Sequence, residues 1–334
     1  MLKSGNPALR ISGSSDRHSF ILPPFAPPKP LTEGPSGCLI QLYPNIGRTR
    51  VLWRPLDRHI RKTRADSLEM KYSVFLEINP DGRTLAHVLE LAGCISRADS
   101  RQEALQRLPG LIHEYHAWLR GHGEATPAED VAIDLQIAGE SSGYGPFDPG
   151  NAAALLPDDP QPVARDELEY YLALAAYGRA DLLGLLCRET PAALGTDGSP
   201  LPELPDDLLD WQPAPHSFSL RRVLRHIGNA EEWYVSRLVS PETLPAEWEH
   251  DEDLPLLQFL AMERRTAVDR LRRLTDDELS RVVYPSQWTD HPEEPWTARK
   301  ALRRLIEHER EHTAQVREIL AARRGMLDHH KPDP

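Results

Sequence analysis

The chain has 334 residues, 40% hydrophobic and 27% charged, as is typical of a globular protein with about two domains. Its net charge of −12 is uneven: residues 1–69 hold 11 Lys and Arg against 5 Asp and Glu, a net of +6, and residues 70–334 hold 28 against 46, a net of −18. An acidic folded part should repel nucleic acid, three distant cysteines form no disulfide framework, and no unbroken apolar run spans a membrane. We expect a cytoplasmic protein without nucleic acid or membrane partners.

Residues 1–69 form a basic extension that contains nine of the 31 prolines and no sustained apolar period. Such a composition predicts disorder. A regular strand pattern then begins abruptly at Met70, so one interpretation is that translation starts there and the extension is not part of the protein. The other is a basic tail that binds an acidic partner.

Residues 70–137 have the pattern of a small α+β domain. Alternating apolar residues indicate strands, a turn sequence joins the first two, and a capping box followed by a helical apolar period indicates a helix. The predicted elements are a strand at Tyr72–Ile78, a turn at Asn79–Gly82, a strand at Thr84–Val88, a helix from the Ser100 cap through Leu119, and a strand at Val131–Ile137. On the helix, His113 and His116 are expected on a solvated face.

This domain resembles the HicB-like family. The resemblance lies in the first strand, in the pair Gly93 and Cys94, and in the Glu103–Leu105 start of the helix. Many members are antitoxins with a DNA-binding segment, which this sequence lacks, so the resemblance implies the fold and a protein-interaction or dimerisation role.

Residues 138–160, rich in Gly and Pro, are expected to be a linker, and residues 161–323 an all-α domain followed by a tail at 324–334. Four amphipathic helices bury their apolar stripes most simply as an up-and-down-type four-helix bundle. The first predicted helix spans Asp166–Arg188, and the second begins at a cap on Ser217 or Ser219 and ends at Leu238. The third spans about Leu256–Leu274, and the fourth runs from near Trp296 to about Arg323.

Three histidines in this domain are candidate metal ligands. His308 and His312 are four residues apart, so their side chains leave the last helix on one side, within about 60° of the centre of its apolar stripe. Two buried imidazoles need partners for their ring nitrogens, and a metal ion satisfies them at once. His226 lies at the edge of the second helix's stripe and supplies a third ligand if the two helices are neighbours. The alternative is ordinary core histidines, hydrogen-bonded to carboxylates or to the backbone.

Glu309 is the candidate catalytic residue, because it lies about 40° from the same stripe and could act as a general base. Its alternative is a salt-bridge partner at the edge of the core. Glu307 and Glu311 are expected to face solvent. Trp233, Tyr234 and Trp288 are candidate pocket residues beside an ion, and the alternative is that they belong to the core.

Residues 161–323 resemble the DinB/YfiT-like four-helix bundle family. The stretch Trp211–Tyr234 is similar to the family's second helix, and Thr297–Gln315 to its fourth. The resemblance places the family's three metal histidines on His226, His308 and His312. It implies a divalent metal, Zn, Ni or Fe(II), with one coordination position open.

From this resemblance we expect a metal-dependent enzyme that activates a thiol or water for a small-molecule substrate. The expected chemistry is that of an S-transferase, isomerase or hydrolase, with a low-molecular-weight thiol as cofactor in the first two. The alternative is a metal-stabilised binding or stress-response module without turnover, whose HicB-like domain mediates protein interaction or homodimer formation.

Overall fold

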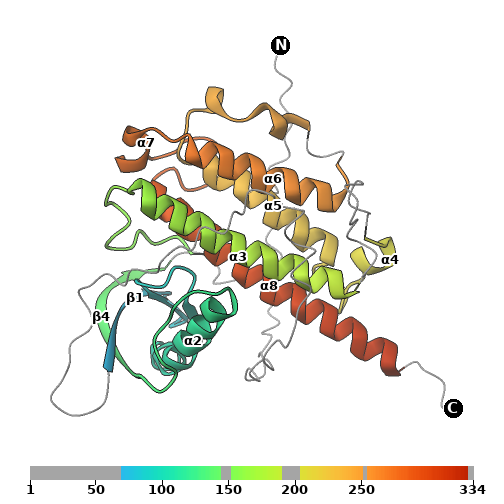
Figure 1. Cartoon of the computed structure of the whole chain (residues 1–334), viewed down its shortest axis with the longest axis horizontal. Helices are drawn as coiled ribbons and strands as arrows, with labels where there is room; N and C mark the ends of the chain where they lie inside the picture. The colour runs from blue at the N-terminus through green and yellow to red at the C-terminus, as the bar shows by residue number, and fades with distance from the viewer. Residues whose placement is uncertain (1–68, 144–151, 190–203, 251–253, 330–334) are drawn as a thin grey trace.

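The structure is a computed structural model that describes residues 69–143, 152–189, 204–250 and 254–329. The predicted basic extension lies outside the described residues, except for Glu69. A sheet with one helix forms the N-terminal unit, and a set of long helices forms the rest (Figure 1). Among the described residues, none of the helices combines the length and apolar character needed to cross a bilayer.

The N-terminal domain is a mixed four-stranded sheet in the order β3-β2-β1-β4. β1 pairs with β2 as an antiparallel hairpin and with β4 in parallel, and the chain reaches β4 through helix α2. A parallel pair needs such a crossover, because a tight turn can join only antiparallel strands. The elements are β1 (Glu69–Ile78), β2 (Thr84–Val88), β3 (Ile95–Ala98), α2 (Arg101–Gly121) and β4 (Ala132–Ser142).

Local chemistry explains these elements. Gly82 takes a φ of +89° in the hairpin turn, where residues with a side chain are strained. Ser100 accepts a hydrogen bond from the Glu103 backbone N–H and caps α2. The four-residue strand β3 was not predicted, since its pattern is too short to separate from a loop, and β4 continues to Ser142, beyond the predicted strand.

The helical region contains the four predicted long helices, α3, α5, α6 and α8, at the expected places. Short helices fill the connections. The elements are α3 (Arg165–Glu189), α4 (Asp206–Leu209), α5 (Leu220–Ser236), η2 (Pro241–Thr243), η3 (Ala246–His250), α6 (Leu256–Arg272), α7 (Asp276–Ser280) and α8 (Ala298–His329). α8 extends six residues beyond the predicted end at Arg323.

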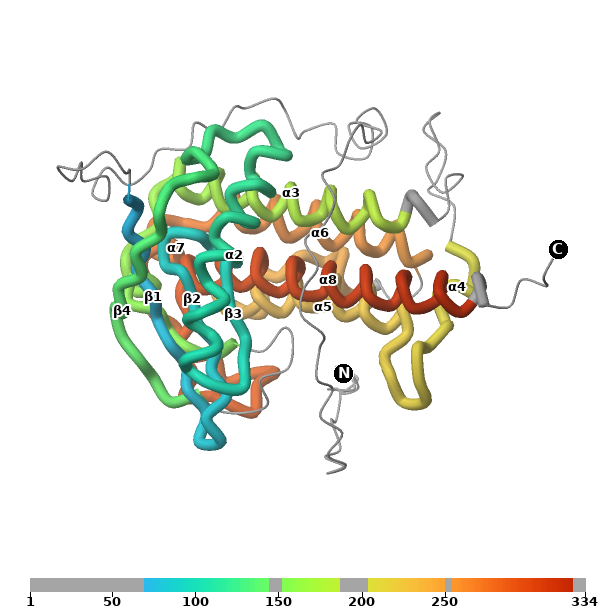
Figure 2. Tube along the Cα trace, turned by 90° about the horizontal axis from the view of Figure 1, so that it is seen from below, coloured from blue at the N-terminus to red at the C-terminus, as the bar shows by residue number. Residues whose placement is uncertain are grey.

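The expectation of an up-and-down order is wrong for the middle of the bundle. Arg225 lies over the ring of Phe259, and Glu231 pairs with Arg264 further along both helices, so α5 and α6 run parallel. The connection at 237–255 is long enough to carry the chain back along the bundle. α3 and α8 also run parallel and end at the same end of the bundle (Figure 2).

The two domains meet along α8 and α3. His87 of β2 lies buried between Glu77 and Glu307, with its Nε2 2.7 Å from the first carboxylate and its Nδ1 3.4 Å from the second. The Trp118 indole N–H donates to Asp181 of α3 at 2.6 Å. The N-terminal domain therefore covers the helix that carries His308 and His312.

Candidate metal centre

Two helices place the three candidate histidines. α5 begins at the Ser219 cap, which accepts from the backbone N–H of Arg222, and it presents His226 near its middle. α8 presents His308 and His312 on successive turns, with ring centroids 4.3 Å apart. α5 and α8 pack antiparallel, because the ring of His226 lies 4.8 Å from that of His312, whereas Tyr234, two turns later on α5, accepts from Arg304, two turns earlier on α8.

The three imidazoles converge on one point. The Nε2 atoms of His308 and His226 are 2.9 Å apart, and the ring of His226 lies 4.7 Å from that of His308 and 4.8 Å from that of His312. One nitrogen from each ring lies within 4.8 Å of the others, so the cluster could hold a metal ion. His308 and His312 are buried, and His226 is exposed, which leaves the cluster a side toward solvent.

The hydrogen bonds of His312 fit a metal ligand. Its Nδ1 lies 2.7 Å from Oε1 of Gln315, and an amide oxygen only accepts, so Nδ1 carries the proton. Nε2 then has a free lone pair, and it is buried without a hydrogen-bond partner among the described residues. A buried nitrogen left this way is costly in a protein interior, and a cation beside it removes the cost.

The surroundings keep the three rings neutral. Desolvation, with smaller contributions from His312 and Arg222, lowers the pKa of His226 to about 4. Burial and the neighbouring histidines hold the pKa of His308 well below its ordinary value, and burial also lowers the pKa of His312. Neutral imidazoles are the form that binds metal.

Aromatic and cationic residues border the cluster. The ring of Tyr234 lies 5.8 Å from that of His308, and its hydroxyl accepts from Arg304 at 3.3 Å. From the N-terminal domain, Arg97 pairs with Glu311 at 2.7 Å, one residue before His312. The sequence pattern indicated Tyr234 as a candidate pocket residue, but it did not indicate Arg304 or the Arg97–Glu311 pair, because these contacts depend on which surfaces pack together.

Glu309 lies in the bundle core and forms ion pairs. Its two oxygens accept from Arg179 of α3 and from Arg264 of α6, and both arginines also pair with Glu231. Burial alone would raise the pKa of Glu309, but the two guanidinium groups outweigh burial and lower it. This is the salt-bridge arrangement that the sequence left open as the alternative to a general base.

Two predictions of solvent-facing residues are wrong. Glu307 is 1% exposed and accepts from Arg303 and Arg304, because the N-terminal domain packs on that face of α8. His116 is 4% exposed and lies 2.6 Å from the Tyr72 hydroxyl, because its helix face packs on the sheet. Glu311, also expected in solvent, is only partly exposed in its pair with Arg97.

The two tryptophans that the sequence offered as pocket residues lie in different places. The ring of Trp233 packs 5.1 Å from that of Trp296, against the end of the bundle where α8 begins. Trp288 lies in the 281–297 connection, is 53% exposed and lines a separate pocket.

Residues 201–316 match the DinB superfamily, so the C-terminal region contains a DinB superfamily domain with a three-histidine cluster that could bind a metal. The match contains all three histidines. It leaves the N-terminal domain unidentified. Searches of curated proteins and of solved structures found no match.

Proposed function

We propose that the protein is a metal-dependent enzyme of the DinB type, in which His226, His308 and His312 bind one divalent ion. The observation that carries the proposal is the convergence of three neutral imidazoles from two helices, with the buried Nε2 of His312 lacking another partner among the described residues. The Nδ1 of His116 is also buried without a hydrogen-bond partner among those residues, so it is the convergence of three rings that distinguishes the cluster.

The residues around the cluster have defined tasks in this proposal. Gln315 fixes the ring of His312 so that Nε2 points to the ion, and Tyr234 packs beside His308. The exposed side at His226 gives a small-molecule substrate access. A divalent ion on three neutral nitrogens keeps a coordination position open and lowers the pKa of a water or thiol there. A low-molecular-weight thiol with an electrophile, or water with a hydrolysable bond, would be the reactants.

We infer a positioning role for Glu309. Both of its oxygens pair with arginines, one from α3 and one from α6. These pairs hold α8 against the two helices next to the ligand His308. A general base needs a free oxygen within reach of the reacting proton. The N-terminal domain, which we propose to be HicB-like, covers the opposite face of α8 and stiffens the same helix.

Metal content tests the ligand set. We expect about one Zn, Ni or Fe per chain in purified protein by elemental analysis, and near-complete loss of that ion in His312→Ala. His291, which is exposed and pairs with its neighbour Glu293 away from the cluster, provides the control His291→Ala, which should keep its metal. If His312→Ala keeps its metal as His291→Ala does, the proposed metal centre is wrong.

Activity tests the enzyme separately. Metal-loaded protein is assayed with a panel of low-molecular-weight thiols and electrophiles, and with hydrolysable esters. Turnover that disappears in His226→Ala supports the enzyme. Tight metal binding with no turnover across the panel supports the non-catalytic module.

A further inference from the structure

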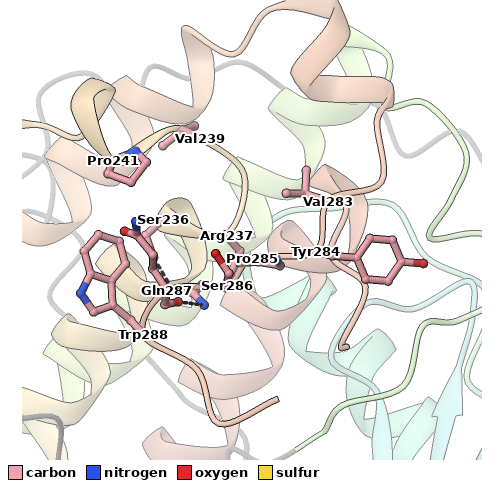
Figure 3. A pocket seen from close by; sticks show the side chains of 10 residues that line it. All are labelled: Ser236, Arg237, Val239, Pro241, Val283, Tyr284, Pro285, Ser286, Gln287 and Trp288. Atoms are coloured by element: carbon pink, nitrogen blue, oxygen red, sulfur yellow. Dashed lines mark hydrogen bonds between the residues drawn. The ribbon is translucent and has the colours of Figure 1, made fainter. Parts of the chain in front are cut away.

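A pocket of about 200 Å³ lies at the end of α5 that is remote from His226 (Figure 3). Its walls come from the end of α5, from the turn at Pro241 and from residues 283–288. Arg237 lines it eleven positions after His226, about 16 Å along a helix, and no candidate metal ligand lines it. The pocket is therefore separate from the metal centre.

The pocket contains a buried cation with no carboxylate partner. Arg237 is 1% exposed, and its guanidinium donates only to neutral groups: the carbonyls of Trp233 and Gln287 and the hydroxyl of Ser236. These three bonds use three of its five N–H donors. Within the described residues, no Asp or Glu oxygen lies within 4.0 Å of Arg237.

The other buried arginines of the described structure are different. Each forms an ion pair with a carboxylate within 4.0 Å; these arginines are Arg179, Arg264, Arg270, Arg303 and Arg304. Burial lowers the pKa of Arg237 to about 10, although Glu294 raises it, whereas Asp159 and Glu307 outweigh burial and raise the pKa of Arg303. A buried charge is normally paired, yet none of the described residues that line this pocket is an Asp or Glu.

The rest of the pocket wall combines apolar and aromatic residues with the polar Ser236, Ser286 and Gln287. Trp288 is 53% exposed and adopts a φ of +52°, an uncommon conformation for a residue with a bulky side chain. The Trp233 indole N–H holds it by donating to the Trp288 carbonyl at 3.1 Å. In Figure 3 the Trp288 ring lies beside Gln287 and below Pro241, while the Tyr284 ring points away. Residues held in such conformations cluster at ligand sites.

We propose that this pocket binds a small aromatic carboxylate, with the carboxylate on Arg237 and the ring against Trp288. A planar carboxylate matches the guanidinium fork, and an exposed indole offers a face for ring stacking. The ligand supplies the negative charge that the protein does not. This site goes beyond the metal centre and does not depend on it.

Benzoate is the probe, measured on the metal-loaded full chain by NMR of the tryptophan indole N–H groups. Benzoate should shift the signals of Trp288 and Trp233 and bind at least about tenfold more tightly than neutral benzamide, the scale of one charge-assisted hydrogen bond. Acetate, which lacks the ring, should bind more weakly than benzoate. Equal binding of benzoate and benzamide, or no shift of either indole, would overturn the proposal.

Variants locate the site. Arg237→Gln and the exposed Trp288→Ala should each weaken benzoate binding about tenfold or more. Arg281→Gln is the matched control, because Arg281 also donates to a carbonyl near the end of α5, that of Leu238, but does not line the pocket. His312→Ala should keep benzoate binding. Loss in His312→Ala would place the carboxylate on the metal, and equal loss in Arg281→Gln would reduce Arg237 to a structural role; either result contradicts the proposal.

Discussion

Glu307→Gln should destabilise the protein strongly, because Glu307 neutralises a group of buried cations between the two domains. Its carboxylate is 1% exposed and accepts from Arg303 at 2.9 and 3.0 Å and from Arg304 at 2.9 Å, and His87 lies 3.4 Å away. Burial would raise the pKa of Glu307, but these three neighbours hold it well below its ordinary value. Glutamine keeps the shape and removes the charge.

The expected loss is about 3–5 kcal/mol, the usual cost of removing one member of a buried ion pair. Asp159 still neutralises Arg303, and Glu77 still faces His87, so we expect the lower half of that range. Glu311→Gln is the matched control one turn further along α8. Glu311 and Arg97 are 15% and 21% exposed, and partly exposed pairs contribute about 1 kcal/mol or less.

The assay is urea unfolding at pH 7, followed by tryptophan fluorescence and circular dichroism. The cost of Glu307→Gln should shrink on acidification. A carboxyl whose folded pKa is lowered stabilises the protein above its unfolded pKa, and the contribution disappears as pH falls through the folded value. Equal stability of the two variants at pH 7 would refute a buried charge cluster at this interface.

Three further predictions follow from other contacts. Saturating metal at 1,000 times its Kd should raise the free energy of unfolding by about 4 kcal/mol in wild type and not in His312→Ala, and a chelator titration measures this difference. Glu307 and Glu77 outweigh burial and raise the pKa of His87. The contribution of His87 to the free energy of unfolding is therefore complete below the unfolded pKa of 6.5 and is lost as pH rises through the folded pKa. The free energy of unfolding, measured from pH 6 to 9, should fall more in wild type than in His87→Gln. Gly228→Ala should cost about 1–3 kcal/mol in thermal unfolding, because an added Cβ would lie 2.3 Å from the Phe259 ring, whereas Gly184→Ala in α3, with open space around it, should stabilise by about 0.5–1 kcal/mol.

The sequence alone located the long helices, three of the four strands and the candidate ligands. Helical period, the Ser219 cap and the spacing of His308 and His312 are local properties, and hydrogen bonds within a few residues fix them. His226 could be a third ligand only if α5 and α8 were neighbours. The structure places them side by side, with the Nε2 atoms of His226 and His308 2.9 Å apart.

Tertiary structure decided how those elements meet. The apolar pattern of a helix does not encode the direction of the neighbouring helix. α5 and α6 run parallel, and the connection between them is long enough to allow this. Glu307 is buried because a second domain covers its helix face, and the apolar pattern of α8 does not indicate that contact. Among the described residues, no carboxylate pairs with Arg237, and the reason is similar. Partners of a buried charge come from segments distant in sequence, and packing brings them together or keeps them apart.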